Sequence, residues 1–346
     1  MSEPAPVYGA VWPLLPPFVL AVCIACVAGA GALANCALLA ALLKSSRNGL
    51  FYILIQLAIA DLILLGTITP ELWSHNTRTW SFGRSGCIAF RGLNVFTSTA
   101  SLYLIFTIAL HSLATMSEED KKALQLSSKR DDHDDDDDEI RSSRHSLVAS
   151  DTSTPRTMNV DYRLTNTRIR IAPPVAFVWI LSASLSIPEF VLSTTVHLDH
   201  DVVLCTLVDT THRLNMHSLL AIFNLFLPVV IMCVTGILIL GRYKRRTQSN
   251  ANETYSALKL SLYLIYLYAA LCVPRSIVTV YSLYSTSTVD NEYAVEQPGY
   301  VLALINLVCS CIYLAAALIR PLLCIIVIPR LRKVFFFGLR NSTEDN

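Results

Sequence analysis

Two ionisable side chains lie within long apolar stretches of the sequence. Asp61 follows the run LAIA, and Arg320 lies within the run AALIRPLL. At the centre of a membrane-spanning helix, either charge alone costs about 2.5 to 3.5 kcal/mol. Paired with each other, the two charges largely cancel this cost, so we expect an ion pair within the membrane. The alternative is that Arg320 extends its guanidinium toward the headgroups of the nearer surface.

The composition of the chain predicts a membrane protein. Hydrophobic residues make up 53% and charged residues 15% of the 346 residues, and the mean hydropathy is +0.49. Apolar stretches of about 20 residues indicate membrane-spanning helices, because backbone groups in lipid must bond within their own segment. The sequence contains seven such stretches: Pro16 to Leu43, Phe51 to Pro70, Ile88 to Met116, Pro173 to Val196, His217 to Leu240, Tyr255 to Tyr284 and Tyr300 to Ile328.

Basic residues predict how these helices are oriented. They follow the first, fifth and seventh stretches: Lys44, Arg47, Arg242, Lys244, Arg245, Arg246, Arg330, Arg332, Lys333 and Arg340. Loops rich in lysine and arginine between membrane-spanning helices face the cytosol. We therefore expect a plasma-membrane protein with an extracellular N-terminus and a cytosolic C-terminus.

The apolar stretches divide the chain into four segments. Residues 1–116 hold the N-terminus and the first three helices, 117–172 an intracellular loop, 173–328 the last four helices, and 329–346 an amphipathic helix and tail. The loop contains the run DDHDDDDDE, whose like charges repel, so we predict that it is disordered. The run PRLRKVFFFGL predicts a short helix on the inner leaflet, in contact with membrane lipid.

The ten cysteines fall into two groups. Eight lie inside apolar stretches, where cysteine acts as a small hydrophobic side chain. Cys87 and Cys205 lie in the predicted outer loops, in an oxidising compartment. We predict a disulfide between them; the alternative is two free outer thiols.

Several motifs resemble those of the rhodopsin-like, class A, G protein-coupled receptors. They are Asn35, LAIAD (Leu57 to Asp61), WSFGRSGC (Trp80 to Cys87), Trp179, Pro188, FNLFLP (Phe223 to Pro228) and ASLYLIFTIAL (Ala100 to Leu110). The resemblance covers all seven helices. It implies an all-α membrane fold, a seven-transmembrane helix bundle with a short amphipathic helix after the seventh. It also implies that an extracellular ligand acts through a heterotrimeric G protein.

The chain departs from this family at its switch residues. At the inner end of the third helix, His111, Ser112 and Leu113 replace the family's acidic residue, arginine and tyrosine. In the sixth helix, Cys272 replaces the aromatic residue two positions before Pro274. Two interpretations are open. The chain is a receptor with a non-standard inner-face switch, or it is a seven-helix binding, trafficking or decoy protein that does not couple.

The seventh helix departs in the same way, because Arg320, Pro321 and Cys324 stand where the family has asparagine, proline and tyrosine. In this family the aspartate that matches Asp61 faces that asparagine across a sodium ion, near a third-helix serine that matches Ser101. We therefore expect the Arg320 guanidinium to replace the sodium ion and to bind Asp61 directly.

The resemblance also implies a ligand pocket in the outer half of the bundle. The side chains expected to face it are Asn94, Ser98, Asn224, Arg275, Thr279, Asn306 and Ser310. Asn94 stands where amine receptors keep an aspartate, so a cationic amine lacks that counter-ion. A buried Arg275 suits an anionic group, which points to an anionic or peptide ligand. Alternatively, Arg275 pairs with an outer acid such as Glu71.

We expect no enzymatic activity, cofactor, metal site or nucleic-acid partner. Catalysis within the membrane needs several converging histidines and acids, and only His111 and His217 qualify. The acidic run lacks the ligand spacing of a calcium loop. The seventh stretch has no lysine, which excludes a retinal Schiff base.

Overall fold

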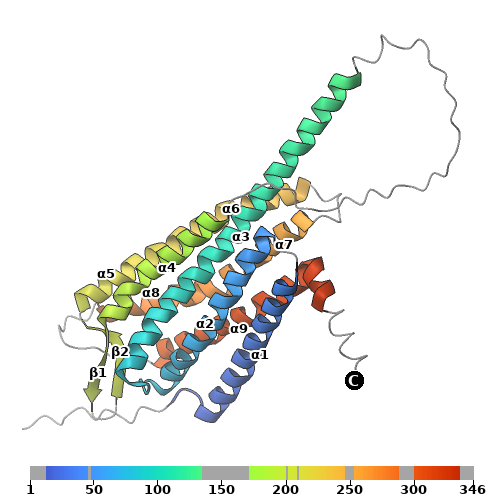
Figure 1. Cartoon of the computed structure of the whole chain (residues 1–346). Coiled ribbons are helices and arrows are strands. Elements are labelled where there is room, and N and C mark those ends of the chain that lie inside the picture. Colours follow the sequence, from blue (N-terminus) through green and yellow to red (C-terminus); the bar gives the residue numbers. More distant parts are fainter. Residues whose placement is uncertain are drawn as a thin grey trace, which may run out of the picture.

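The computed structural model describes residues 13–45, 48–134, 171–199, 202–208, 210–245, 253–287 and 300–335. Seven helical segments in this part of the chain are long and apolar enough to cross a membrane, and they form one bundle (Figure 1). The first four crossings are α1 (Pro17–Lys44), α2 (Gly49–Thr77), α3 (Gly83–Asp134) and α4 (Ala172–Leu192). The predicted seven-helix fold is confirmed.

The fifth and sixth crossings each contain a π-helical turn. The fifth comprises α5 (Thr210–Ala221), η1 (Ile222–Phe226) and α6 (Leu227–Arg245), and the sixth comprises α7 (Glu253–Leu267), η2 (Tyr268–Cys272) and α8 (Val273–Ser287). Pro228 and Pro274 follow η1 and η2 closely. A proline has no N–H for the carbonyl one turn earlier, and a widened turn accommodates that loss. The seventh crossing is the continuous helix α9 (Tyr300–Val327).

A β-hairpin lies at one end of the bundle. Its strands, β1 (Ser193–Asp199) and β2 (Val202–Leu207), are antiparallel, with Thr195 opposite Cys205. The Trp80 backbone N–H donates to the Val203 carbonyl over 2.7 Å, which ties the hairpin to the α2–α3 connection. At the opposite end α3 projects beyond the other helices (Figure 1). We call these two ends the hairpin end and the extension end.

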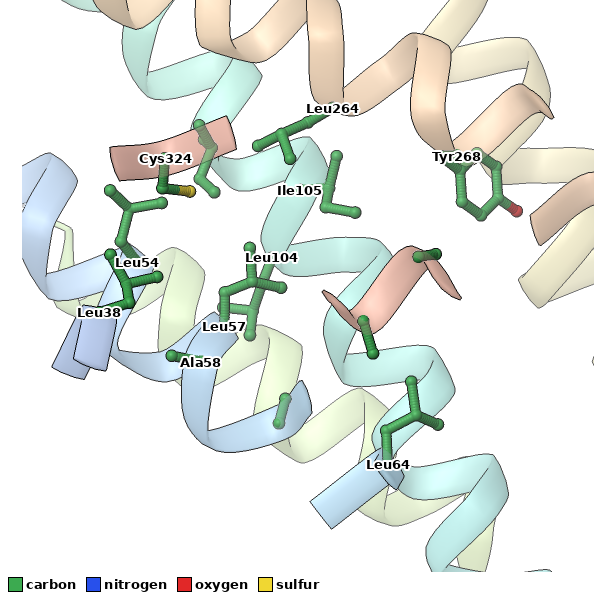
Figure 2. Close-up of a cluster of buried hydrophobic side chains, with 14 of the residues drawn as sticks. Leu38, Leu54, Leu57, Ala58, Leu64, Leu104, Ile105, Leu264, Tyr268 and Cys324 are labelled. Atoms are coloured by element: carbon green, nitrogen blue, oxygen red, sulfur yellow. The ribbon is translucent and has the colours of Figure 1, made fainter. Parts of the chain in front are cut away.

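Apolar side chains from most of the helices form a core around α3. Figure 2 shows part of this core, which includes Leu54, Leu57 and Leu64 of α2 and Leu104 and Ile105 of α3. These five side chains are all buried. Apolar side chains of both helices are therefore buried inside the bundle.

One glycine sets the distance between α3 and α4. A Cβ added at Gly92 would lie 2.4 Å from ring atoms of Phe190. A rigid ring cannot yield that much space, so Gly92 allows the close approach of the two helices. This contact positions the α4 residues that face α3.

Three of the differences between the structure and the sequence-based boundaries have a clear physical cause. The prediction that residues 117–172 are disordered is wrong for residues 117–134, which continue α3. Good helix formers occupy this part, and Glu118 pairs with Lys121 one turn later over 3.1 Å. The remainder of the predicted loop, residues 135–170, lies outside the described residues.

The other two differences concern the second and fourth crossings. Pro70 does not end α2, which continues to Thr77 because a proline removes only one backbone donor. The fourth helix ends at Leu192 rather than Val196, and the run Ser193 to Val196 enters strand β1 instead. The threonines and valine of that run favour a strand.

Residues 329–335 form the short helix expected after the seventh crossing. Leu331 is fully buried, and Val334 and Phe335 pack against the bundle core. Arg332 and Lys333 are exposed on its other face. This segment is thus amphipathic, while residues 336–346 lie outside the described residues.

Candidate functional site

A cavity of about 340 Å³ opens between the helices in the hairpin half of the bundle. Six of the seven side chains predicted to face a pocket line it: Asn94, Ser98, Asn224, Arg275, Thr279 and Asn306. The seventh, Ser310, lies behind the wall, where its hydroxyl donates to Glu71 over 3.1 Å. Cavities of this size accommodate small organic molecules.

Glu71 of α2 is the centre of the first polar network in the cavity wall. Its carboxylate accepts from Arg275 of α8, with the Nη2 atom 2.6 Å from Oε2 and the Nε atom 3.1 Å from Oε1. Asn94 of α3 and Ser310 of α9 also donate to it, each over 3.1 Å. The Arg275 guanidinium in addition lies 4.5 Å from the centre of the Tyr313 ring. One carboxylate therefore joins four crossings.

A second ion pair crosses the cavity wall from α3 to α4. Arg91 Nε lies 2.7 Å from Glu189 Oε2, and the Glu189 side chain is 1% exposed. Arg91 Nη2 also contacts His217 Nε2 of α5 at 3.2 Å. Sequence reasoning missed this pair. The sequence feature that could have revealed the pair is Glu189, because an acidic residue inside an apolar stretch needs a partner.

The floor of the cavity holds the third pair. Arg320 Nη1 lies 2.8 Å from Asp61 Oδ1, and the two side chains are 3% and 1% exposed. Ser101 donates to the same carboxylate oxygen over 3.1 Å. The guanidinium is buried and paired rather than extended toward the membrane surface. These residues do not fit a sodium ion, because the Arg320 cation already holds the carboxylate that would bind it.

The two π-helical turns place several polar groups beside the cavity. Tyr268 of η2 donates to the Asn224 carbonyl of η1 over 3.1 Å. Thr99 of α3 donates to the Asn224 side-chain oxygen, also over 3.1 Å. Cys272 ends η2 and lines the cavity. The widened turns thus fix how the fifth and sixth crossings meet α3.

The remaining predicted switch residues lie deeper in the bundle. Pro274 follows η2 within α8, and Pro321 is buried inside α9. Cys324 is 1% exposed and belongs to the apolar core (Figure 2). None of these three residues is among those that line the cavity.

At the extension end, a hydroxyl pair joins α3 to α7. The Ser112 and Ser261 Oγ atoms lie 3.0 Å apart, and both residues are 1% exposed. Nearby, Thr254 of α7 donates to Glu119 of α3. His111 is only half-buried and packs close to Gly49 at the start of α2. The position where the family has arginine is therefore filled by a neutral contact.

A second contact at the extension end is more exposed. Arg242 Nη1 of α6 lies 3.6 Å from Asp120 Oδ2 of α3, and both side chains are more than 40% exposed. Such pairs contribute less than about 1 kcal/mol. Polar contacts of α3 thus reach both α6 and α7 beyond the apolar core.

The disulfide between Cys87 and Cys205 is confirmed. It joins the first turn of α3 to strand β2 across a sequence separation of 118 residues. Cys205 also lines the cavity. The bond therefore holds the hairpin against the cavity mouth.

Replacing both Cys87 and Cys205 by serine is expected to lower the melting temperature of the purified protein in lipid nanodiscs. A crosslink across a loop of this length stabilises by roughly 5 kcal/mol in the chain-entropy account. The control is Cys26→Ser, an exposed position on α1. Equal melting temperatures for the double variant and this control would contradict a stabilising role for the disulfide.

Two comparisons with known proteins agree with the fold. The family model of the 7 transmembrane receptor (rhodopsin family) matches residues 157–322. The chain is also similar to dopamine receptor 4 of Caenorhabditis elegans, with 27% identity over 230 residues. That alignment covers 64% of this chain and 35% of the relative, so the chain matches about a third of the relative's length.

Proposed function

We infer that the chain belongs to the rhodopsin-like family of seven-transmembrane receptors, which is not an enzyme family, and we propose that it is a plasma-membrane receptor. Its cavity binds an extracellular ligand, and its extension end carries the signal to a cytosolic partner, a heterotrimeric G protein. The observation that supports this proposal is the continuous cavity wall, which runs from the hairpin to the Asp61–Arg320 pair.

The distribution of charge supports this orientation. Arg242 and Lys244 end the fifth crossing, and Arg330, Arg332 and Lys333 follow the seventh. All five lie at the extension end, where the positive-inside rule favours the cytosol. The hairpin end and the mouth of the cavity then face the outside.

The ion pairs bear on the class of ligand. The expectation of an anionic ligand depends on a free Arg275, whereas Arg275 is held by Glu71. This pairing supports the alternative, in which Arg275 is a structural cation. The relative is named a dopamine receptor, but Asn94 stands here where amine receptors have an aspartate. A small ligand or one end of a peptide must therefore bind through other contacts.

The Asp61–Arg320 pair can act as a fixed ionic joint between α2 and α9. In the family a mobile sodium ion bridges the second and seventh helices, whereas here the cation is covalently attached to α9. We propose that this joint keeps the two helices together without sodium. Its stability then does not depend on the sodium concentration.

The contacts at the extension end support a non-standard switch. Family members use an arginine at the position of Ser112 to engage the G protein. In this chain Ser112 is buried against Ser261. We propose that signalling separates α3 from α7 at this hydroxyl pair, which opens the inner face to the partner.

Basal signalling in cells that lack background receptors tests this function. The native chain and a Ser112→Arg variant are expressed beside a panel of G protein sensors, with surface expression measured in parallel. Signal from the native chain would support a receptor with a rebuilt switch. Silence in the native chain with signal from Ser112→Arg would favour the alternative, a seven-helix binding, trafficking or decoy protein that has lost coupling.

In the same assay, Ser261→Ala is expected to raise basal signal about fivefold. A neutral hydrogen bond contributes about 1 kcal/mol, so its loss shifts a two-state equilibrium by roughly that factor. Ser184→Ala on α4 is a matched control, because this exposed serine also bonds to the carbonyl four residues earlier but joins no second helix. An unchanged signal in Ser261→Ala would argue against the hydroxyl pair as the switch.

A further inference from the structure

We propose that the cavity recognises a ligand group that donates hydrogen bonds, an amine or an amide, through two acceptor oxygens, Glu189 Oε1 and Asn94 Oδ1. This inference rests on the proposed function, because it names the ligand class of the same cavity. It replaces the aspartate of amine receptors with an acceptor pair supplied by α4 and α3.

The first acceptor is an oxygen of a deeply buried carboxylate. Glu189 is 1% exposed and lines the cavity. Its Oε2 atom accepts from Arg91 over 2.7 Å. Its Oε1 atom is also buried, and within the described residues it accepts no hydrogen bond. A buried carboxylate oxygen without a donor is costly, so the site favours a group that supplies one.

The second acceptor is fixed by the first polar network. Asn94 lines the cavity, and its Nδ2 atom donates to Glu71 over 3.1 Å. An ionised carboxylate only accepts, so the amide nitrogen must face Glu71 and the amide oxygen must face away. That oxygen, Oδ1, is buried and has no hydrogen-bond partner in the described part of the chain.

Both acceptors are linked to α3, Asn94 as one of its residues and Glu189 through Arg91. Arg91 and Asn94 are three residues apart on α3 and therefore share a helix face. Arg91 holds Glu189 against this face. Trp80, Phe90 and Val95 line the same cavity and offer apolar contacts for the body of a ligand. The arrangement suits an aromatic or aliphatic molecule that carries one donor group.

The ion pairs of the cavity wall disfavour an anionic ligand. Arg91 and Arg275 are each held by a carboxylate, at 2.7 Å and 2.5 Å. An anionic ligand would have to displace Glu189 or Glu71 and leave that acid buried without a cation. A donor group fills the open acceptors and leaves both ion pairs in place.

Three probes that share a phenylethyl group and differ in their polar end test this assignment on the full chain in lipid nanodiscs. They are 2-phenylethylamine, 3-phenylpropanamide and 3-phenylpropanoate, and the measurement is the dissociation constant of each, with the melting temperature as a second readout. We expect the native protein to bind the amine about tenfold more tightly than the carboxylate, with the amide between them.

Variants at the two acceptors should both weaken the amine but differ in their effect on the carboxylate. Glu189→Gln turns the open acceptor into a donor and removes the counter-charge of Arg91, so the amine should weaken about tenfold and the carboxylate should bind more tightly. Asn94→Leu removes the second acceptor and should weaken the amine and amide while leaving the carboxylate unchanged. The control is Ser184→Ala on α4, because this serine is exposed and is not among the residues that line the cavity.

Three results would overturn the inference. The first is that the carboxylate binds the native protein most tightly. The second is that all three probes bind equally, which is expected if water molecules satisfy both oxygens. The third is that no probe binds at millimolar concentration. The proposed receptor function is judged separately by the basal-signal assay, which involves no probe. Each failure can therefore be told apart from the other.

Discussion

The Arg320→Asn variant is expected to lose stability and to become sensitive to sodium. Asp61 would lose its counter-ion and keep the hydrogen bond from Ser101, in a site where its side chain is 1% exposed. Removing one partner of a buried ion pair costs about 3 to 5 kcal/mol. Sodium can then supply the missing positive charge, and a ligand that binds only the folded protein raises its stability.

The measurement is the melting temperature in nanodiscs with sodium chloride or with choline chloride at the same ionic strength. The native chain should melt at one temperature in both salts. Arg320→Asn should melt several degrees lower in choline and regain part of the loss in sodium. The double variant Asp61→Asn with Arg320→Asn is the control, because it has no charge to compensate and should not respond to sodium. The proposed fixed joint would be contradicted if sodium raised the melting temperature of the native protein. It would also be contradicted if sodium left the melting temperature of Arg320→Asn unchanged.

The helix bundle could be predicted from the sequence because its signal is local. Each crossing is a run of apolar residues, and the run itself determines that the backbone bonds internally. The ends of the helices have a weaker local signal, because polar residues can continue a helix beyond its apolar run. Thus α2 continues past Pro70 through Glu71 and His75, and α3 continues past Met116 to Asp134.

The cavity was predictable in outline but not in its pairings. The resemblance placed Asn94 and Arg275 at the cavity, whereas the pairing of Arg275 with Glu71 was one of two alternatives. The distance along the chain between these two residues is 204 positions. Which acid faces which base depends on the rotation of each helix in the bundle, and apolar periodicity does not determine that angle.

The Arg91–Glu189 pair shows the same limit more clearly. Both residues are visible in the sequence, and Glu189 follows a proline inside an apolar run. Their meeting depends on the close packing of α3 and α4 at Gly92, which only the three-dimensional arrangement reveals. A rule that assigns a partner to every acid within a predicted crossing would have marked Glu189 as a site residue.

The second large effect is expected at Glu71. Glu71→Gln keeps the shape of the side chain but leaves the Arg275 guanidinium buried without a counter-charge, and it weakens the contacts with Asn94 and Ser310. We expect a loss of about 3 to 5 kcal/mol, equivalent to a fall of roughly 10 °C in melting temperature. Surface expression should fall in parallel, because a less stable fraction is degraded.

Two controls separate this effect from a general sensitivity to charge. Asp120→Asn removes one partner of the exposed Arg242 pair and should change the melting temperature only slightly. The double variant Glu71→Met with Arg275→Met removes both buried charges and should be more stable than either single replacement. If Glu71→Gln and Asp120→Asn had equal effects, Glu71 would not be the joint of four crossings. A double variant less stable than both singles would instead mean that the pair stabilises beyond cancelling its own desolvation cost.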